Sequence, residues 1–151
     1  TRVMTHRVVK ATVPLPAAYL VRAGAADRYA ELLRRNDIPF RRLQGTEELH
    51  GESCRLLRVE SESDPVYARY GGRQVVERDP AAPVTAAAGA LLVDVEGPLA
   101  ARTVALLEPC MLYGLYQYPV WRETVGPDGA IPVVRVTAKR VRNPGGADPD
   151  G

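Results

Sequence analysis

The sequence has few of the side chains that most often carry chemistry near neutral pH. Among 151 residues it holds two histidines, two cysteines, one tryptophan and one phenylalanine. Imidazole and thiol groups are the usual ligands of zinc and the usual bases and nucleophiles of hydrolytic sites. We therefore expect no metal and no cofactor in this chain, and the residue chemistry alone does not identify a function.

Concentrated charge and long apolar runs are also missing. The chain has 20 Lys+Arg against 18 Asp+Glu, a formal net charge of +2, whereas binding of nucleic acid needs a concentrated basic face. No stretch approaches the roughly 20 apolar residues of a membrane span, and no basic head precedes an apolar run as in a signal peptide. We expect neither nucleic acid nor a membrane as partner. The first residue is Thr1, which fits a fragment of a longer chain whose targeting signal would lie upstream.

What the sequence does contain is the composition of one ordinary globular domain, with 46% hydrophobic and 25% charged residues. A domain of this size can bury enough apolar surface to fold without a metal or disulfide framework. We predict a single α+β domain over residues 1–142, a mixed β-sheet with two helices packed on it. Residues 143–151 are almost entirely Gly, Pro and Asp, which predicts a disordered tail.

Two helices and several strands are predicted from periodicity. Apolar residues at helical spacing indicate an amphipathic helix over 25–36 with Gly24 as its N-cap, and Gly97-Pro98 begins a second helix that Pro109 ends. Strands are predicted over 8–21 (an entering or edge strand because of its prolines), 40–43, 47–60, 75–78, 90–95 (a central strand) and 134–139 (one wet face). Residues 79–83 break a strand, residues 61–72 form a loop in which Val66, Tyr67 and Tyr70 fold back on apolar surface, and residues 126–129 form a turn.

Few residues qualify as candidates for catalysis or metal binding. His50 and Glu52 could point to the same side of a strand, but a zinc site needs a third ligand that only His6, Cys54 or Cys110 could add. No nucleophile motif surrounds Ser53, Cys54 or Cys110. The two cysteines could form one disulfide, although their separation favours free buried thiols, and the apolar context of Cys110 predicts an unreactive thiol with a raised pKa.

Two clusters could bind a partner. Arg34, Arg35, Arg41 and Arg42 form the densest basic group, which either binds an anionic partner or a sister domain or is a solvated face. Tyr113, Tyr116, Tyr118 and Trp121 lie within nine positions, in a segment predicted to be a loop or an irregular strand. Their amphipathic rings suit an interface, so this segment is either a docking surface or part of the core.

Two separated stretches resemble a known family. Residues 15–21 (LPAAYLV), the helix 29–38 (YAELLRRNDI) and the strand 40–43 (FRRL) are similar to a pattern that follows the catalytic domain in many bacterial zinc carboxypeptidase-like proteins, of the carboxypeptidase A superfamily. Residues 97–100 (GPLA), 106–109 (LLEP), 113–115 (YGL) and 131–136 (IPVVRV) resemble later parts of the same region. Order and spacing agree over about residues 13–136. Asp37 stands where the family usually has Gly.

The resemblance implies a non-catalytic C-terminal accessory domain whose parent, a metallopeptidase, would hydrolyse C-terminal peptide or amide bonds. The family binds zinc through a His-x-x-Glu pair and a distant His, and none of these can be placed on this chain. The implied partner is the neighbouring catalytic domain of the same parent chain, docked on the Tyr113–Trp121 segment, with zinc only in that domain. A secreted or periplasmic location would agree with the resemblance. The alternatives are a free-standing protein-interaction or ligand-binding module and, last, an independent Cys/His hydrolase.

Overall fold

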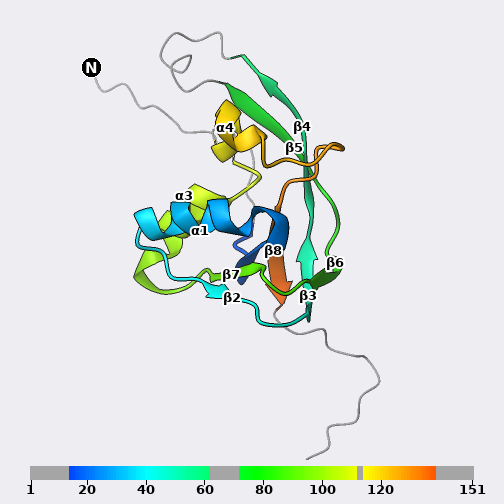
Figure 1. Cartoon of the computed structure of the whole chain (residues 1–151). Helices are drawn as coiled ribbons and strands as arrows, with labels where there is room; N and C mark the ends of the chain where they lie inside the picture. Colours follow the sequence, from blue (N-terminus) through cyan, green and yellow to red (C-terminus); the bar gives the residue numbers. More distant parts are fainter. Residues whose placement is uncertain (1–13, 62–71, 112–113, 139–151) are drawn as a thin grey trace, which may run out of the picture.

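The computed structural model describes residues 14–61, 72–111 and 114–138 (Figure 1). In chain order the elements are β1 (Ala18–Val21), the 3-10 helix η1 (Ala23–Ala25), α1 (Ala26–Arg35), β2 (Arg41–Arg42), β3 (Glu47–Glu52), β4 (Cys54–Glu60), β5 (Arg73–Arg78), β6 (Ala82–Ala86), β7 (Leu91–Asp94), η2 (Gly97–Leu99), α3 (Ala100–Leu107), η3 (Leu115–Gln117), α4 (Pro119–Arg122) and β8 (Val133–Ala138). This confirms the α+β class with two main helices on a sheet. The predictions for Val66, Tyr67, Tyr70, Tyr113 and the tail lie outside the described residues.

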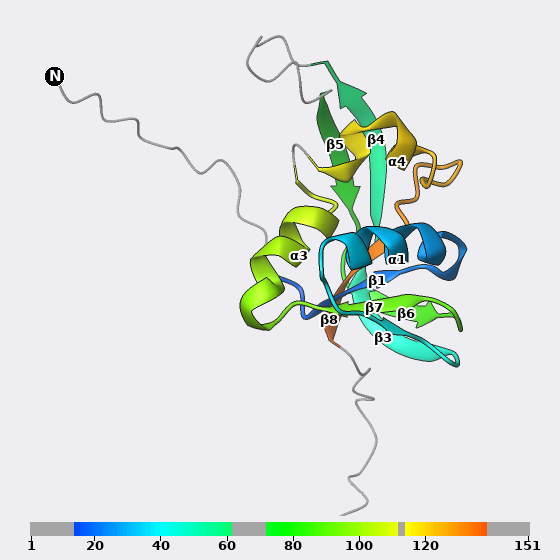
Figure 2. The same ribbon diagram turned by 60° about the vertical axis from the view of Figure 1, so that its left-hand side comes forward.

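The main sheet has six strands in the order β2-β7-β1-β8-β3-β6, and β4 and β5 form a separate two-stranded sheet. Neighbouring strands in these described sheets are antiparallel. The strands β1 and β2 are not adjacent, because β7 lies between them. The β1-α1-β2 segment is therefore a split β-α-β unit. Figure 2 shows α1 and α3 on the same side of the six-stranded sheet, while the β4–β5 pair extends beyond it with α4 alongside.

The first helix, α1, agrees with its prediction to within one residue at each end. Tyr29 and Leu33 are on its buried side, and Ala25 rather than Gly24 is the N-cap. The helix ends at Asn36, whose side-chain amide donates to the Leu32 carbonyl at 2.9 Å. The next residue, Asp37, has a φ of 56°, the left-handed conformation in which glycine is usual after a helix. An aspartate tolerates this conformation better than most residues, so the helix can end there without glycine.

Several strand predictions were wrong in instructive ways. The predicted strand 47–60 is divided at Ser53 into β3 and β4, which belong to different sheets. Of the two alternatives for the first strand, an entering or an edge strand, the edge position is wrong, because β1 lies between β7 and β8. Pro14 and Pro16 precede β1 and so remove none of its ladder hydrogen bonds. The predicted break at residues 79–83 is wrong for Pro83, which lies in β6, because β6 is an edge strand of the six-stranded sheet, where proline is tolerated.

Two further predictions need correction. The aromatic segment forms the short helices η3 and α4, not a loop or an irregular strand. The predicted wet face of the last strand is also wrong for Arg135, which is 2% exposed in β8. A charged residue is buried when its charge is paired, and the partners of Arg135 come from distant parts of the sequence.

The six-stranded sheet is covered on both faces. One face packs against the helices in a cluster that includes Tyr19, Tyr29 and Val133. The opposite face carries an aliphatic cluster that combines Leu43, next to β2, with Val84 of β6. Since these two residues come from opposite ends of the strand order, the sheet must curl around the aliphatic cluster.

Candidate functional site

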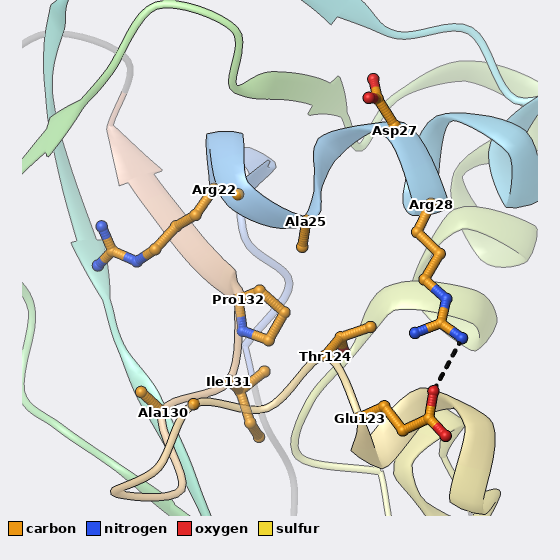
Figure 3. Close-up of a pocket in the computed structure, with 11 residues that line it drawn as sticks. Arg22, Ala25, Asp27, Arg28, Glu123, Thr124, Ala130, Ile131 and Pro132 are labelled. Carbon is orange, nitrogen blue, oxygen red and sulfur yellow. Dashed lines mark hydrogen bonds and ion pairs between the residues drawn. The ribbon is translucent and has the colours of Figure 1, made fainter.

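A pocket with a volume of about 510 Å³ opens between the start of α1 and residues 123–132 (Figure 3). Ala25, Ile131 and Pro132 give it apolar walls. Arg28 Nη2 donates to Glu123 Oε2 at 3.2 Å across one side of the pocket. The side chain of Arg22 extends away from this ion pair in Figure 3. The pocket therefore offers apolar contact beside one ion pair, which suits binding rather than acid-base chemistry.

The predicted docking segment divides into a buried part and an exposed part. Tyr116 is 2% exposed, and its hydroxyl lies 2.8 Å from the Tyr29 hydroxyl. Trp121 is partly buried, with its ring edge-on to Tyr29 at a centroid distance of 5.1 Å and the guanidinium of Arg28 over its face. Tyr118 is 46% exposed. Tyr113 lies outside the described residues, and Tyr116 belongs to the core because its hydroxyl has a partner there.

The four arginines of the basic cluster all have local partners. Arg35 pairs with Glu31 at 2.5 Å, Arg41 with Glu47 at 3.0 Å and Arg42 with Asp27 at 3.1 Å, while Arg34 stacks on Phe40 at 5.3 Å. The Arg41 guanidinium lowers the pKa of the exposed Glu47 carboxyl through their hydrogen bond. The charges of Arg35, Arg41 and Arg42 are thus partly neutralised by carboxylates, which reduces the field that this surface offers to an anion.

The structure brings together a buried polar row that the sequence did not predict. Tyr19 of β1, Arg135 of β8 and Glu52 of β3 lie directly opposite one another on adjacent strands. Arg135 donates from Nη1 to Glu52 and from Nε to Glu108 at 3.0 Å, and the Tyr19 hydroxyl donates to Glu108 at 2.6 Å. We call Tyr19, Arg135, Glu52 and Glu108 the buried row. Two features of the sequence could have indicated the buried row: the positive charge of Arg135 within an apolar strand and the negative charge of Glu108 directly after an apolar helix.

Burial makes the phenols of the helix-side core poor acids. It raises the pKa of the Tyr19 hydroxyl, and the hydrogen bond to the Glu108 carboxylate raises it further. The pKa values of Tyr29 and Tyr116 are also raised, mainly by burial. The pKa of Arg135 is raised because the adjacent Glu108 and Glu52 carboxylates outweigh the cost of burial. The Tyr19 hydroxyl and the Arg135 guanidinium of the buried row therefore keep their protons near neutral pH.

His50 and Glu52 have different partners, and His6 lies outside the described residues. His50 interacts with Thr137 at 3.1 Å, whereas Glu52 pairs with Arg135 and Arg78. Within residues 14–61, 72–111 and 114–138, no three His, Cys, Asp or Glu side chains gather as metal ligands would. The same ranges contain no helix long and apolar enough to cross a membrane.

Both cysteines are free, Cys54 buried and Cys110 partly exposed. The prediction that the apolar context raises the pKa of Cys110 was wrong. Its pKa is lowered because a side-chain hydrogen bond with Cys54 outweighs the effect of burial. The same interaction, together with burial, raises the pKa of Cys54.

No family model, no curated protein and no solved structure matches this chain.

Proposed function

We propose that the chain is a non-catalytic C-terminal accessory domain of a zinc carboxypeptidase-like protein, which supports the catalytic domain or shapes access to its cleft. The observation that carries the proposal is where the family-like stretches fall. Residues 15–43 contribute β1, α1 and β2, and residues 97–136 contribute α3, η3 and most of β8. β1, α1, α3, η3 and β8 share one hydrophobic cluster between the helices and the sheet, and Phe40, just before β2, packs against it. The resemblance therefore concerns a connected core rather than isolated surface motifs.

The surface near α4 supplies a docking face for the catalytic domain. Tyr118 and Val120 are 46% and 50% exposed, which places them among the most exposed large hydrophobic side chains of the described residues. Trp121 lies next to them, held by Tyr29 and Arg28. Aromatic anchors that are fixed before binding lose little conformational entropy on association. The docking surface proposed here is accordingly Tyr118, Val120 and the exposed part of Trp121.

The gene provides the first test. Sequencing on both sides of the segment that encodes residues 1–151 should find, upstream and in frame, a His-x-x-Glu motif and a later His. An open reading frame without these ligands would contradict the assignment to a carboxypeptidase-like parent.

Association with the separately expressed catalytic domain provides the second test. Replacing both Tyr118 and Val120 by Ser should weaken binding at least tenfold, the scale of losing an interface anchor, roughly 1.4 kcal/mol or more. Titration calorimetry measures the affinity, and circular dichroism checks that the fold is retained. The matched control is Leu57→Ser, because Leu57 is 53% exposed but lies on β4. Equal losses in the two variants would reject the α4 face as the docking surface.

The second candidate is a free-standing module that binds a protein or a small ligand. The pocket beside α1 favours it, since about 510 Å³ with apolar walls and one ion pair is within the range of small-ligand sites. Filling the pocket by Ala25→Leu would abolish binding of such a ligand and leave association with a catalytic domain unchanged. The two candidates therefore make opposite predictions for the Ala25 and Tyr118/Val120 variants.

A further inference from the structure

The two cysteines of the chain meet in the core although they are 56 positions apart in the sequence. Cys54 is the first residue of β4 and is 2% exposed. Cys110 follows the C-terminal end of α3 and is partly exposed. Both belong to the hydrophobic cluster under the helices, and the thiols lie close enough to shift each other's pKa. No other cysteine competes with this pair.

The backbone on both sides of the pair is fixed by hydrogen bonds. The Cys54 carbonyl accepts from the Ile131 amide at 3.0 Å, and the Cys110 amide donates to Glu108 Oε1 at 3.0 Å. Glu108 is itself anchored by the buried row. One residue before Cys110, the Pro109 carbonyl accepts from the side-chain amide of Gln74 of β5 at 2.8 Å. These contacts hold the turn after α3 against the β4–β5 pair and keep the two thiols close.

The two thiols differ in pKa and in exposure, as expected for the first and second thiols of a two-step oxidation to a disulfide. The hydrogen bond with Cys54 lowers the pKa of Cys110, while burial and the same interaction raise the pKa of Cys54. The thiolate is the nucleophilic form of cysteine, and access for an oxidant depends on exposure. Cys110 is the more exposed of the two thiols, so an oxidant reaches it first, and Cys54 is shielded from the solvent.

We propose that Cys54 and Cys110 form a redox-active dithiol that a peroxide converts into an intramolecular disulfide, covalently joining β4 to the end of α3. Figure 2 shows that the β4–β5 pair extends away from the six-stranded sheet. The disulfide would tie this extension to the helix layer. This site does not depend on the accessory-domain function.

The chemistry proceeds in two balanced steps. The Cys110 thiolate attacks one oxygen of the peroxide, an S–O bond forms as the O–O bond breaks, and the departing hydroxide takes up a proton to become water. Cys110 is thereby oxidised to a sulfenic acid. The sulfur of Cys54 then attacks that of Cys110, the S–S bond forms as the S–O bond breaks, and hydroxide leaves with the Cys54 proton as water. Two thiols and one peroxide give one disulfide and two waters.

The experiment treats the purified full chain with hydrogen peroxide and analyses the monomer. Titration with a thiol reagent in denaturant should fall from two thiols to none, and the intact mass should decrease by two hydrogen atoms. Digestion without reductant should yield a peptide pair that links Cys54 to Cys110, and dithiothreitol should restore both thiols. A monomer that retains both thiols, gains oxygen atoms instead, or is linked only into dimers would overturn the proposal.

Two single variants test the order of attack. In Cys54→Ser the sulfenic acid on Cys110 has no resolving thiol, so it should accumulate and be trapped by dimedone. In Cys110→Ser the remaining buried Cys54 should react with peroxide much more slowly than Cys110 does. A Cys110→Ser chain that reacts as fast as the wild type would overturn the assignment of Cys110 as the first site. If either variant fails to fold, the mass and peptide analysis of the wild type still decides whether the disulfide forms.

Discussion

Residues that alternate along β1 and β8 go to two different cores. On one side of the sheet Leu20 and Val134 join a cluster that consists of aliphatic side chains. On the other side Tyr19 and Arg135, their sequence neighbours, join the buried row. The aliphatic core is stabilised by burial, which is non-directional and tolerates changes that preserve volume. The helix-side core also contains directional hydrogen bonds and charges, so it demands particular partners at particular positions.

The strongest test of this difference removes the buried cation. Arg135→Met should remove the cation that the Glu52 and Glu108 carboxylates share, and the expected cost is about 3–5 kcal/mol in the free energy of unfolding. Urea denaturation measures it. The matched control is Arg55→Met, because Arg55 forms an exposed pair with Glu77 that should contribute about 1 kcal/mol or less. If Arg135→Met and Arg55→Met lost similar amounts of stability, the buried ion pairs would contribute no more than an exposed pair, and the buried row would not set the helix-side core apart from the aliphatic core.

The sequence predicted those elements whose signals are local. The helix α1 has an apolar period, a polar face and a terminating residue within a dozen positions, so its boundaries could be predicted to within a residue. The interior strand β7 is an apolar run. Both predictions depend on properties of neighbouring residues alone.

What the sequence could not predict depends on contacts between distant residues. Arg135 looks like a solvent-facing residue because its alternation is that of a half-buried strand, and its partners Glu52 and Glu108 lie 83 and 27 positions away. The proximity of Cys54 and Cys110 likewise follows from the change of sheet at Ser53, which a continuous strand pattern conceals. The aromatic segment could be assigned to a docking surface or to the core, and in the structure Tyr116 is buried whereas Tyr118 is exposed.

The aliphatic face should respond to lost volume rather than to changed polarity. Leu20 is fully buried between Leu92 and Val134 on the neighbouring strands. Leu20→Ala should cost about 3 kcal/mol because it leaves a cavity, whereas Leu20→Met should cost less than about 1.5 kcal/mol. Urea denaturation of the two variants side by side measures the difference. A Met variant as unstable as the Ala variant would mean that this core, too, depends on particular side-chain shapes.

Alkaline unfolding should originate on the helix side. The pKa values of Tyr19, Tyr29 and Tyr116 are raised in the folded chain, so above about pH 10 the unfolded phenols lose protons that the folded ones keep. Stability is therefore complete below pH 10 and falls as pH rises, by about 1.4 kcal/mol per pH unit for each such phenol.

Tyr19→Phe should reduce that slope by about one phenol, and urea denaturation at a series of pH values above 10 measures it. Leu20→Met, which leaves the helix-side core intact, serves as the control and should retain the wild-type slope. If Tyr19→Phe also retained the wild-type slope, the Tyr19 hydroxyl would be losing its proton in the folded chain as well. Its hydrogen bond to Glu108 would then not keep the hydroxyl protonated.

The smallest expected effect concerns one hydroxyl pair within the helix-side core. Tyr116→Phe keeps the ring in place but removes the partner that Tyr29 has at 2.8 Å, and Tyr29 retains only Thr124 at 3.3 Å. The expected cost is about 1 kcal/mol, measured by urea denaturation. Adding Tyr29→Phe should cost little more, since removing both hydroxyls leaves neither without its partner. If the two losses simply add, the hydroxyls are not coupled, and the directional character of this core resides in the buried row alone.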